Sequence, residues 1–322
     1  MRVSVVIPCY NEEENLGPCI AETLQVLDEA GLEGELLVID DGSTDGSGRV
    51  MGEWAARSPR VRVIRLRRNF GQTAAMVAGI DHAQGEVILA LDADRQNDPR
   101  DIPRLLALLD EGWDVVSGWR RHRQDRAVSR LFPSRVANWL IARISGVRLH
   151  DFGCTLKAYR RELIQEVRLY GEMHRFIPIH VAWGGGRVTE LEVNHRPRLA
   201  GRSKYGIWRT PKVLVDLLTL KFLGDYSTRP AHFFGAIGLL FCTLGFFSGA
   251  FALFQKFAWG VWAHKNPLVL LAVFLFSVGV QIGLIGLLAD LLMRTYHESV
   301  GKPIYRVRET LNLEPAEVRR PR

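Results

Sequence analysis

The chain has 322 residues and a formal net charge of +7, a length that allows one large domain or two modest ones. The positive charge favours an anionic partner, and nucleic acid is the weakest such candidate because no recognition module for it is visible. The mean hydropathy of +0.00 averages a charged amino-terminal two thirds with the nearly uncharged residues 231–289.

Strand-like and helix-like runs alternate through the first third of the chain. Short apolar runs predict strands at Val3–Ile7, Leu36–Ile39, Val61–Leu66, Val87–Leu91 and Asp114–Ser117. Helical periodicity predicts the intervening helices Glu13–Ala30, Gly46–Arg57, Gln72–Ala83 and Pro99–Glu111. The alternation favours an α/β fold with a mostly parallel, doubly wound sheet, in which the loops after the strands share one crevice.

The amino-terminal domain is expected in the cytoplasm. The chain enters the apolar run Val3–Ile7 at once, without the length or cleavage site of a signal peptide. The four cysteines show no C-x-x-C spacing, so we expect them to stay reduced.

The strand Val87–Leu91 ends in two carboxylates, Asp92 and Asp94, with Gln96 two residues further on. Hard oxygen ligands at the carboxyl end of a buried strand suit a divalent cation that bridges a diphosphate. The two aspartates would equally serve to cap the helix that begins near Pro99. This stretch alone leaves both interpretations open.

Four motifs then occur in a recognisable order: PCYNE (Pro8–Glu12), DDGSTD (Asp40–Asp45), NFG (Asn69–Gly71) and DADRQ (Asp92–Gln96). Together they resemble family 2 glycosyltransferases, which have the GT-A nucleotide-sugar-binding fold. Three further stretches resemble the polyprenyl-phosphate hexosyltransferases, namely HDFGCTLKAYRR (His150–Arg161), GEMHRFIP (Gly171–Pro178) and GRSKYG (Gly201–Gly206). That group contains dolichyl-phosphate mannose synthases and undecaprenyl-phosphate glucosyl- or mannosyltransferases. Arg95 departs from the pattern, since these enzymes usually carry an apolar or small residue there.

The resemblance implies inverting transfer of glucose or mannose from UDP-glucose or GDP-mannose to undecaprenyl or dolichyl phosphate, at the cytoplasmic membrane face. It implies Mg²⁺ or Mn²⁺ held by Asp94 and Gln96, with Asp92 on the metal or on the ribose. The residues that would frame the base and ribose are Pro8, Tyr10, Glu12 and Asp40. Arg202 and Lys204 would clamp the phosphates, although their loop is alternatively a solvated basic connector.

The acceptor phosphate also needs cations. Six arginines between Arg120 and Arg135 fall within sixteen residues, and apolar residues interleave with them from Leu131 onward. Such a segment suits an anionic membrane surface. By resemblance, Arg120 and Arg135 would bind the lipid phosphate, with Arg175 a third candidate. Ordinary attraction to anionic lipid is the alternative, and the two interpretations are compatible.

The chain contains no Glu-Asp dipeptide, the pair from which many family 2 enzymes take a base for a sugar hydroxyl. A phosphate monoester has a second pKa of about 6 and is largely anionic at pH 7, so the missing pair agrees with a phosphate nucleophile. Asp151 is then the candidate catalytic residue for orienting or weakly deprotonating the acceptor. It would equally serve a structural role, capping the turn that contains Gly153.

Phe233–Phe254 and Leu268–Ala289 are each 22 residues without a charge, about 33 Å as helices and enough to span a membrane. The Lys and Arg excess after Asp290 places both termini in the cytoplasm. The motifs Gly245-x-x-x-Gly249 and Gly279-x-x-x-Gly283 permit close helix approach, within the hairpin or between subunits of a homo-oligomer.

The expected organisation has four parts: a cytoplasmic GT-A domain (1–210), an amphipathic juxtamembrane segment (211–230), two helices across the cell (inner) membrane (231–293) and a basic cytoplasmic tail (294–322). A processive polysaccharide synthase would carry a Q-x-x-R-W motif and more spans, and a dinucleotide enzyme would carry G-x-G-x-x-G. A non-catalytic nucleotide-sugar-binding scaffold would have lost the metal carboxylates or the clamp cations. The motifs do not define which sugar or base is used.

Overall fold

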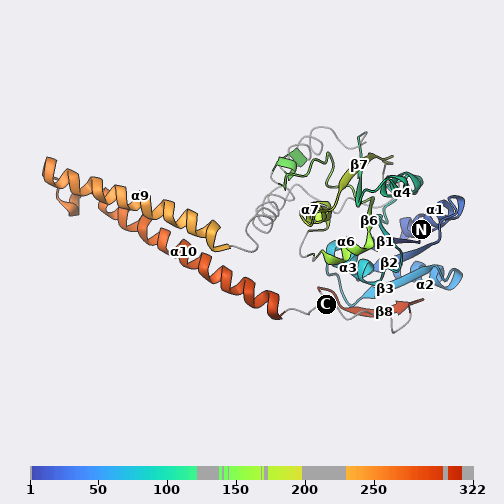
Figure 1. Ribbon diagram of the computed structural model, residues 1–322. Helices are drawn as coiled ribbons and strands as arrows, with labels where there is room; N and C mark the ends of the chain where they lie inside the picture. The colour runs from blue at the N-terminus through green and yellow to red at the C-terminus, as the bar shows by residue number, and fades with distance from the viewer. Residues whose placement is uncertain are drawn as a thin grey trace. The chain divides into compact units, whose positions relative to one another are not determined.

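The computed structural model describes residues 2–121, 138–139, 141–143, 145–167, 169, 173–197, 230–299 and 304–313. The chain forms two units, Met1–Leu217 with Lys302–Arg322, and Leu218–Gly301 between these segments (Figure 1). The predicted amphipathic stretch Pro211–Leu223 lies outside the described residues, as do Arg135, Arg202 and Lys204.

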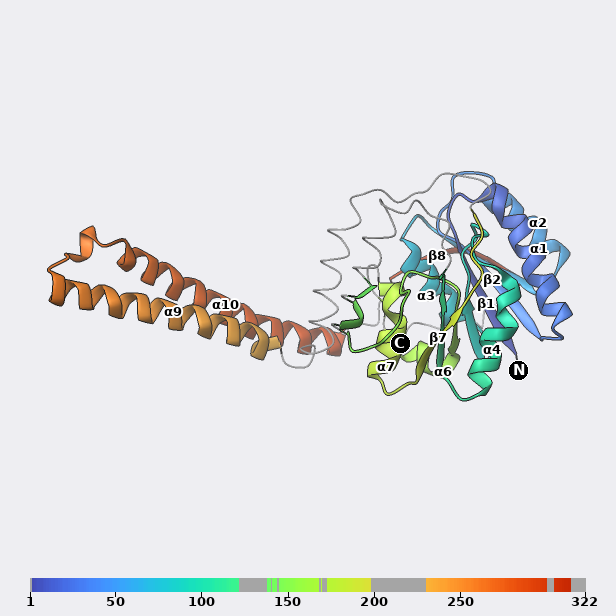
Figure 2. The same ribbon diagram turned by 90° about the horizontal axis from the view of Figure 1, so that it is seen from above.

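The first unit is an α/β fold with helices on both faces of one sheet (Figures 1 and 2). Its strands are β1 (Val3–Cys9), β2 (Gly34–Asp40), β3 (Val61–Leu66), β4 (Val87–Ala90), β5 (Val115–Trp119), β6 (Lys157–Arg160), β7 (Val188–Glu192) and β8 (Val307–Leu311). Its helices are α1 (Glu13–Glu29), α2 (Ser47–Arg57), α3 (Gln72–His82), α4 (Ile102–Asp110), α6 (Arg161–Glu166) and α7 (Ile177–Trp183), with 3-10 turns η1 (Pro99–Asp101) and η3 (Met173–Phe176). The predicted strands and helices all have counterparts here, with small shifts at their ends.

The sheet has the strand order β7-β5-β6-β4-β1-β2-β3-β8. The pairs β1–β2, β1–β4, β2–β3 and β5–β7 are parallel, whereas β6 and β8 run antiparallel to their neighbours. The prediction of an α/β fold with a mostly parallel sheet is confirmed.

Alternating side chains of the strands fill two separate cores. In β1, Val5 and Ile7 pack on the face covered by α1, α2 and α4, whereas Val6 packs on the face covered by α3, α6 and α7. The same alternation separates Val38 from Ile39 in β2. Because both faces are covered, these strands are apolar at nearly every position, which is why short apolar runs predicted them.

The antiparallel strand β6 is inserted between β4 and β5. Its first residue, Lys157, lies opposite Ala90 of β4 and opposite Ser117 of β5. Since β6 begins where β4 ends, the loop that leads into β6 lies at the carboxyl edge of the parallel strands. We call residues 151–156 the entry loop.

The strand β8 lies beyond the second unit in sequence but belongs to the first unit. It pairs antiparallel with β3, and Asn312 next to it donates from Nδ2 to the carbonyls of Ala55 at 2.8 Å and Val61 at 2.9 Å. Before the strand, Tyr305 donates its hydroxyl to Asp81 at 2.9 Å. The residues predicted to form a basic tail, 294–322, therefore contain a strand of the sheet.

The second unit is a helical hairpin of α9 (Pro230–Trp259) and α10 (Pro267–Ser299), with the turn η4 (Ala263–Lys265) between them. Residues Phe234–Trp259 and Pro267–Leu288 are long and apolar enough to cross a membrane. Glycines bring the two helices together: a Cβ on Gly238 would lie 2.6 Å from the Gly279 carbonyl oxygen, and a Cβ on Gly245 2.9 Å from the Ala272 carbonyl oxygen. Both glycine motifs therefore serve contacts within the hairpin, and their use between subunits stays a prediction.

Candidate functional site

The loops after β1, β2 and β4 meet at one edge of the sheet. β1 pairs in parallel on both sides, with Cys9 opposite Asp40 of β2 and Val6 opposite Ala90 of β4. The loops that follow these strands therefore leave the sheet side by side, at the kind of position where open α/β sheets bind ligands.

Asp92 lies at this edge and is held by two side chains from distant segments. Gln72, at the start of α3, donates Nε2 to Asp92 Oδ1 at 2.9 Å, and Thr155 of the entry loop donates Oγ1 to Asp92 Oδ2 at 2.6 Å. Burial, followed by the charge of Asp94, raises the pKa of Asp92 to about 6. Asp92 and Asp94 are thus neighbouring, partly buried carboxylates, and a divalent cation would neutralise their negative charges.

Asp94 and Gln96 lie on the same loop as Asp92, between β4 and η1. We call this loop, residues 91–98, the acidic loop. The backbone N–H of Gln96 donates to Asp94 Oδ1 at 3.2 Å. Protein donors contact both oxygens of Asp92, and direct contact of Asp94 with a cation stays a prediction. Among the described residues, no three His, Cys, Asp or Glu side chains form a metal-binding group. Mg²⁺ is commonly held by one or two carboxylates together with waters and substrate phosphates, and the two carboxylates of this loop fit that donor set.

Arg95, the residue that departs from the family pattern, connects this loop to α1. Its φ of +60° lies in the left-handed region, which a non-glycine residue seldom adopts. Its guanidinium lies 3.7 Å from Glu22 of α1, and the same carboxylate pairs with Arg196 at 2.7 Å. The loop that carries Asp94 is therefore connected to α1 through Glu22.

Residues after β7 brace the acidic loop from the other side. The backbone N–H of Arg196 donates to the Gln96 carbonyl at 2.8 Å, and the Arg196 guanidinium pairs with Asp98 at 2.6 Å. Asn194 donates to the same carboxylate at 2.9 Å. Burial alone would raise the pKa of Asp98, but the hydrogen bonds from Arg196 and Asn194 outweigh it and lower that pKa. Asp98 therefore has a structural role in this loop.

The predicted donor residues lie at the same edge. Asp40 is buried at the end of β2 and accepts the backbone N–H of Ser43 at 2.7 Å. Glu12 accepts from Asn15 Nδ2 at 2.9 Å at the start of α1. Pro8 and Tyr10, both half-buried, stand at the end of β1 and directly after it. Contact of any of these residues with a nucleotide stays a prediction.

Asp41 explains why two of the sequence motifs occur together. Its carboxylate accepts the backbone N–H groups of Phe70 at 2.7 Å and Gly71 at 2.9 Å, and burial raises its pKa. The next residue, Gly42, has a φ of +72°, and a Cβ there would lie 2.5 Å from the Arg68 carbonyl carbon. The DDG motif therefore holds the NFG loop in place. Gln72 directly follows that loop, so the same contacts position Gln72.

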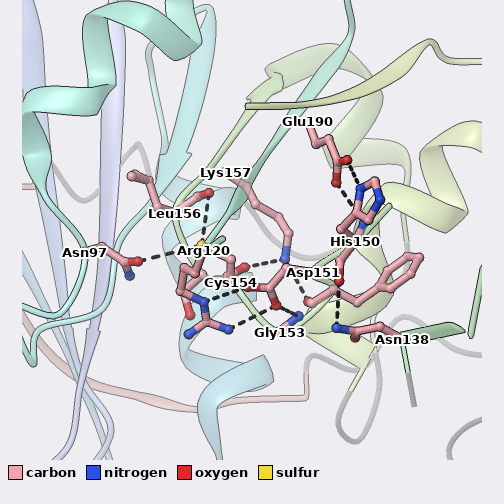
Figure 3. Close-up of polar contacts among 12 residues, drawn as sticks. Asn97, Arg120, Asn138, His150, Asp151, Gly153, Cys154, Leu156, Lys157 and Glu190 are labelled. Atoms are coloured by element: carbon pink, nitrogen blue, oxygen red, sulfur yellow. Dashed lines mark hydrogen bonds and ion pairs between the residues drawn. The ribbon is translucent and has the colours of Figure 1, made fainter. Parts of the chain in front are cut away.

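Arg120, a predicted acceptor residue, forms a bidentate ion pair with Asp151 (Figure 3). Arg120 donates Nε to Asp151 Oδ2 at 2.7 Å and Nη2 to Oδ1 at 3.1 Å. Burial would lower the pKa of Arg120, but the charge of Asp151 reverses that effect and raises it. Asp151 also accepts the backbone N–H of Gly153 at 3.0 Å, the contact expected of a turn cap. The Asp151 carboxylate thus accepts from both the Arg120 guanidinium and the Gly153 backbone. These contacts favour a role for Asp151 in orienting Arg120.

Of the other two predicted acceptor residues, Arg135 lies outside the described part of the chain and Arg175 is half-buried in η3. Burial lowers the pKa of Lys157, the first residue of β6, and the charge of Arg175 adds to that shift. Next to Arg175, buried His174 shares a 2.8 Å hydrogen bond between Nδ1 and the Thr73 hydroxyl. This contact connects η3 to the same end of α3 that holds Asp92.

The sequence motifs did not identify Gln72, Thr155 or Lys157 individually as site residues. Gln72 directly follows the NFG motif, and the other two lie within the HDFGCTLK stretch. Their membership in recognised motifs was the available signal. The contacts of Gln72 and Thr155 could not be inferred, because each meets Asp92 from a different part of the chain. Lys157 contacts the nearby carbonyls of Phe152 and Cys154, and that contact depends on the folded shape of the loop.

Known proteins resemble the chain over nearly its full length. The model of the family described as "Glycosyl transferase family 2" matches residues 4–168. The dodecaprenyl-phosphate galacturonate synthase of Rhizobium johnstonii is 42% identical over 316 residues, which is 96% of this chain and 93% of the relative. The undecaprenyl-phosphate 4-deoxy-4-formamido-L-arabinose transferase of Shewanella sediminis is 37% identical over 312 residues, which is 96% of this chain and 92% of the relative.

A solved structure supports the fold. It is the glucosyl-3-phosphoglycerate synthase of Mycobacterium tuberculosis in complex with Mn²⁺, uridine diphosphate and phosphoglyceric acid. The TM-score is 0.53, with 19% identity over 68% of this chain and 78% of the other. At this identity the similarity is one of fold, and with the family match it confirms the predicted GT-A fold.

Proposed function

The chain belongs to glycosyl transferase family 2, and from this premise we propose that it transfers a hexose from a nucleotide diphosphate to the phosphate of a polyprenyl lipid. Both relatives described above are named for transfer to a polyprenyl phosphate. The observation that carries the proposal is the entry loop. It contacts the acidic Asp92 through Thr155 and the cation Arg120 through Asp151, so one segment joins a donor side to an acceptor side.

On the donor side, Asp94 and Gln96 would hold Mg²⁺ or Mn²⁺, with Asp92 beside them. The cation would neutralise the charge that develops on the departing nucleotide diphosphate. Gln72 and Thr155 fix the Asp92 carboxylate, so its orientation requires no reorganisation when donor binds. Pro8, Tyr10, Glu12 and Asp40 would frame the base and ribose, and Arg202 and Lys204 would clamp the phosphates.

On the acceptor side, Arg120 would bind the lipid phosphate, together with Arg135 and Arg175. Asp151 engages Nε and Nη2 of Arg120, which fixes the plane of the guanidinium and leaves its other amino group for a phosphate oxygen. The phosphate is largely ionised at pH 7, so no protein base is required to activate it. Direct attack on the anomeric carbon would invert its configuration.

The order of segments in the fold supports a two-helix anchor with both ends on one side of the membrane. The first unit contains chain from before and after the hairpin, and β8 is paired into its sheet. If α9 and α10 each span the cell membrane, the segments flanking the hairpin must lie on the same face. The positive-inside rule makes that face the cytoplasm.

Transfer by the purified full chain in lipid nanodiscs tests the proposal. We expect labelled sugar to enter the lipid fraction only with undecaprenyl or dolichyl phosphate present, to stop with EDTA and to resume with Mg²⁺ or Mn²⁺. The donor panel contains UDP-glucose, GDP-mannose and, because of the galacturonate relative, UDP-galacturonate. Proton NMR of the product should show a β linkage from an α-linked donor. Sugar on a hydroxyl acceptor instead, or a retained α linkage, would refute the mechanism.

A further inference from the structure

Lys157 is a buried cation that none of the roles above requires. The residue is 2% exposed, and it is the first residue of β6, between β4 and β5. Burying an ammonium group is unfavourable unless its protons are accepted by nearby groups. Its position therefore calls for a physical reason.

The partners of Lys157 are backbone carbonyls of the entry loop. Its Nζ donates to the Cys154 carbonyl at 2.5 Å and to the Phe152 carbonyl at 3.1 Å (Figure 3). The thiol of Cys154 is no ionic partner, because burial raises its pKa to about 11 and leaves it neutral. A single flexible side chain with several donors thus holds two alternate carbonyls of one loop.

The same loop carries the two contacts that link the halves of the site. Near its start, Asp151 holds Arg120, and near its end Thr155 donates to Asp92. The carbonyls of Phe152 and Cys154 lie between these residues in sequence, so Lys157 fixes the segment that separates them. A change in the loop would move both side chains together.

We propose that Lys157 is a positioning residue, whose ammonium holds the entry loop in the conformation that places Thr155 on Asp92 and Asp151 on Arg120. This inference rests on the proposed function for its catalytic meaning, because only there do the two contacts serve donor and acceptor. Lys157 itself touches neither substrate.

Hydrogen exchange in the full-length protein tests the physical part directly. In Lys157→Met we expect backbone amides of residues 152–156 to exchange about tenfold faster than in the wild type. The matched control is Arg62→Met, which removes another buried cation of the same sheet, on β3, paired there with Glu35. The control should leave the entry loop unchanged. Unchanged exchange in Lys157→Met would overturn the proposal, and Lys157→Gln carries the same test if the Met variant does not fold.

A double-mutant cycle tests whether Lys157 acts through Thr155. Binding of Mn²⁺ with UDP, and in parallel with GDP, is measured for Lys157→Met, Thr155→Val and the double variant. We expect the double variant to bind no more weakly than the weaker single variant, because both changes remove the same contact to Asp92. Additive losses would overturn the proposal. These binding measurements need no lipid acceptor. If the wild type failed to glycosylate polyprenyl phosphate, the proposed function would be refuted, but the test of Lys157 would still be valid.

Discussion

The proposed donor and acceptor sides of the site are built in different ways. On the donor side, Asp92, Asp94 and Gln96 lie on one short loop after a buried strand. On the acceptor side, Arg120 and Asp151 are 31 positions apart and meet only through the arrangement of β5, β6 and the entry loop. A local motif can therefore reveal the first side, whereas the second exists only in the folded sheet.

The largest expected effect is on the donor side. Asp94→Asn keeps the size of the side chain and removes its charge, so the fold should survive. Loss of direct metal contact should cost several kcal/mol of transition-state stabilisation, at least about a hundredfold in kcat/KM. Asp28→Asn, on the surface of α1, is the control for loss of one negative charge. Normal turnover with unchanged metal dependence would remove Asp94 from the metal site.

On the acceptor side, Arg120→Ala should raise the KM for polyprenyl phosphate and leave nucleotide binding nearly unchanged. We expect a change of about ten- to a hundredfold, the range for a hydrogen-bonded charge. Arg120→Lys should recover only part of the loss, because an ammonium cannot form the bidentate pair with Asp151. Arg49→Ala, an exposed arginine of α2, is the control. Equal damage to donor affinity would place Arg120 on the diphosphate instead.

Thr155→Val should weaken the connection between the two sides. It removes the hydroxyl that donates to Asp92 and leaves a side chain of similar shape. The expected cost is about 1 kcal/mol, a few-fold in Mn²⁺ affinity with bound nucleotide. Thr155→Ser keeps the hydroxyl and should bind Mn²⁺ almost as the wild type does, as titration calorimetry can establish. If Ser and Val variants were equally weak, the Thr155 methyl group rather than its hydroxyl would matter.

An effect of comparable size to that of Thr155→Val is expected in the pH dependence of folding stability. Burial lowers the pKa of Lys157 from 10.5 to about 8; the charge of Asp151 opposes the shift and those of Arg120 and Arg175 add to it. Between these two values the unfolded chain binds the proton more tightly than the folded chain, so stability should rise with pH there. Relative to Lys157→Met, the wild type should gain at most about 1.4 kcal/mol per pH unit above pH 8. Thermal unfolding of both proteins at pH 7, 8 and 9 checks the sign, and a falling difference would contradict it.

The sequence predicted the parts of the molecule in which local pattern and tertiary environment agree. The runs around Val5, Val38 and Leu89 are apolar because both faces of the sheet are covered, and the same burial makes them easy to recognise. Asp92 and Asp94 stood out because they interrupt such a run. In each case the physical cause acts within a few residues.

Features that depend on distant pairing were not predicted. β8 has only five residues, of which two are charged and only two are aliphatic, and it is a strand because the edge of β3 accepts it. β6 is four residues long and starts with a buried lysine, which is atypical of a central strand. Gln72 and Thr155 gain their roles from Asp92, which neither adjoins in sequence.

The return of the chain to β3 makes folding depend on the order of synthesis. The ribosome makes the hairpin before it makes β8, so the sheet stays incomplete until both membrane helices have been translated. A fragment that ends near Asp225 would lack β8 and leave an open edge, which favours aggregation. It would also leave the carbonyls of Ala55 and Val61 without Asn312. A faithful soluble version of this enzyme therefore has to excise the hairpin and rejoin the chain, because cutting the chain before the hairpin removes part of the sheet.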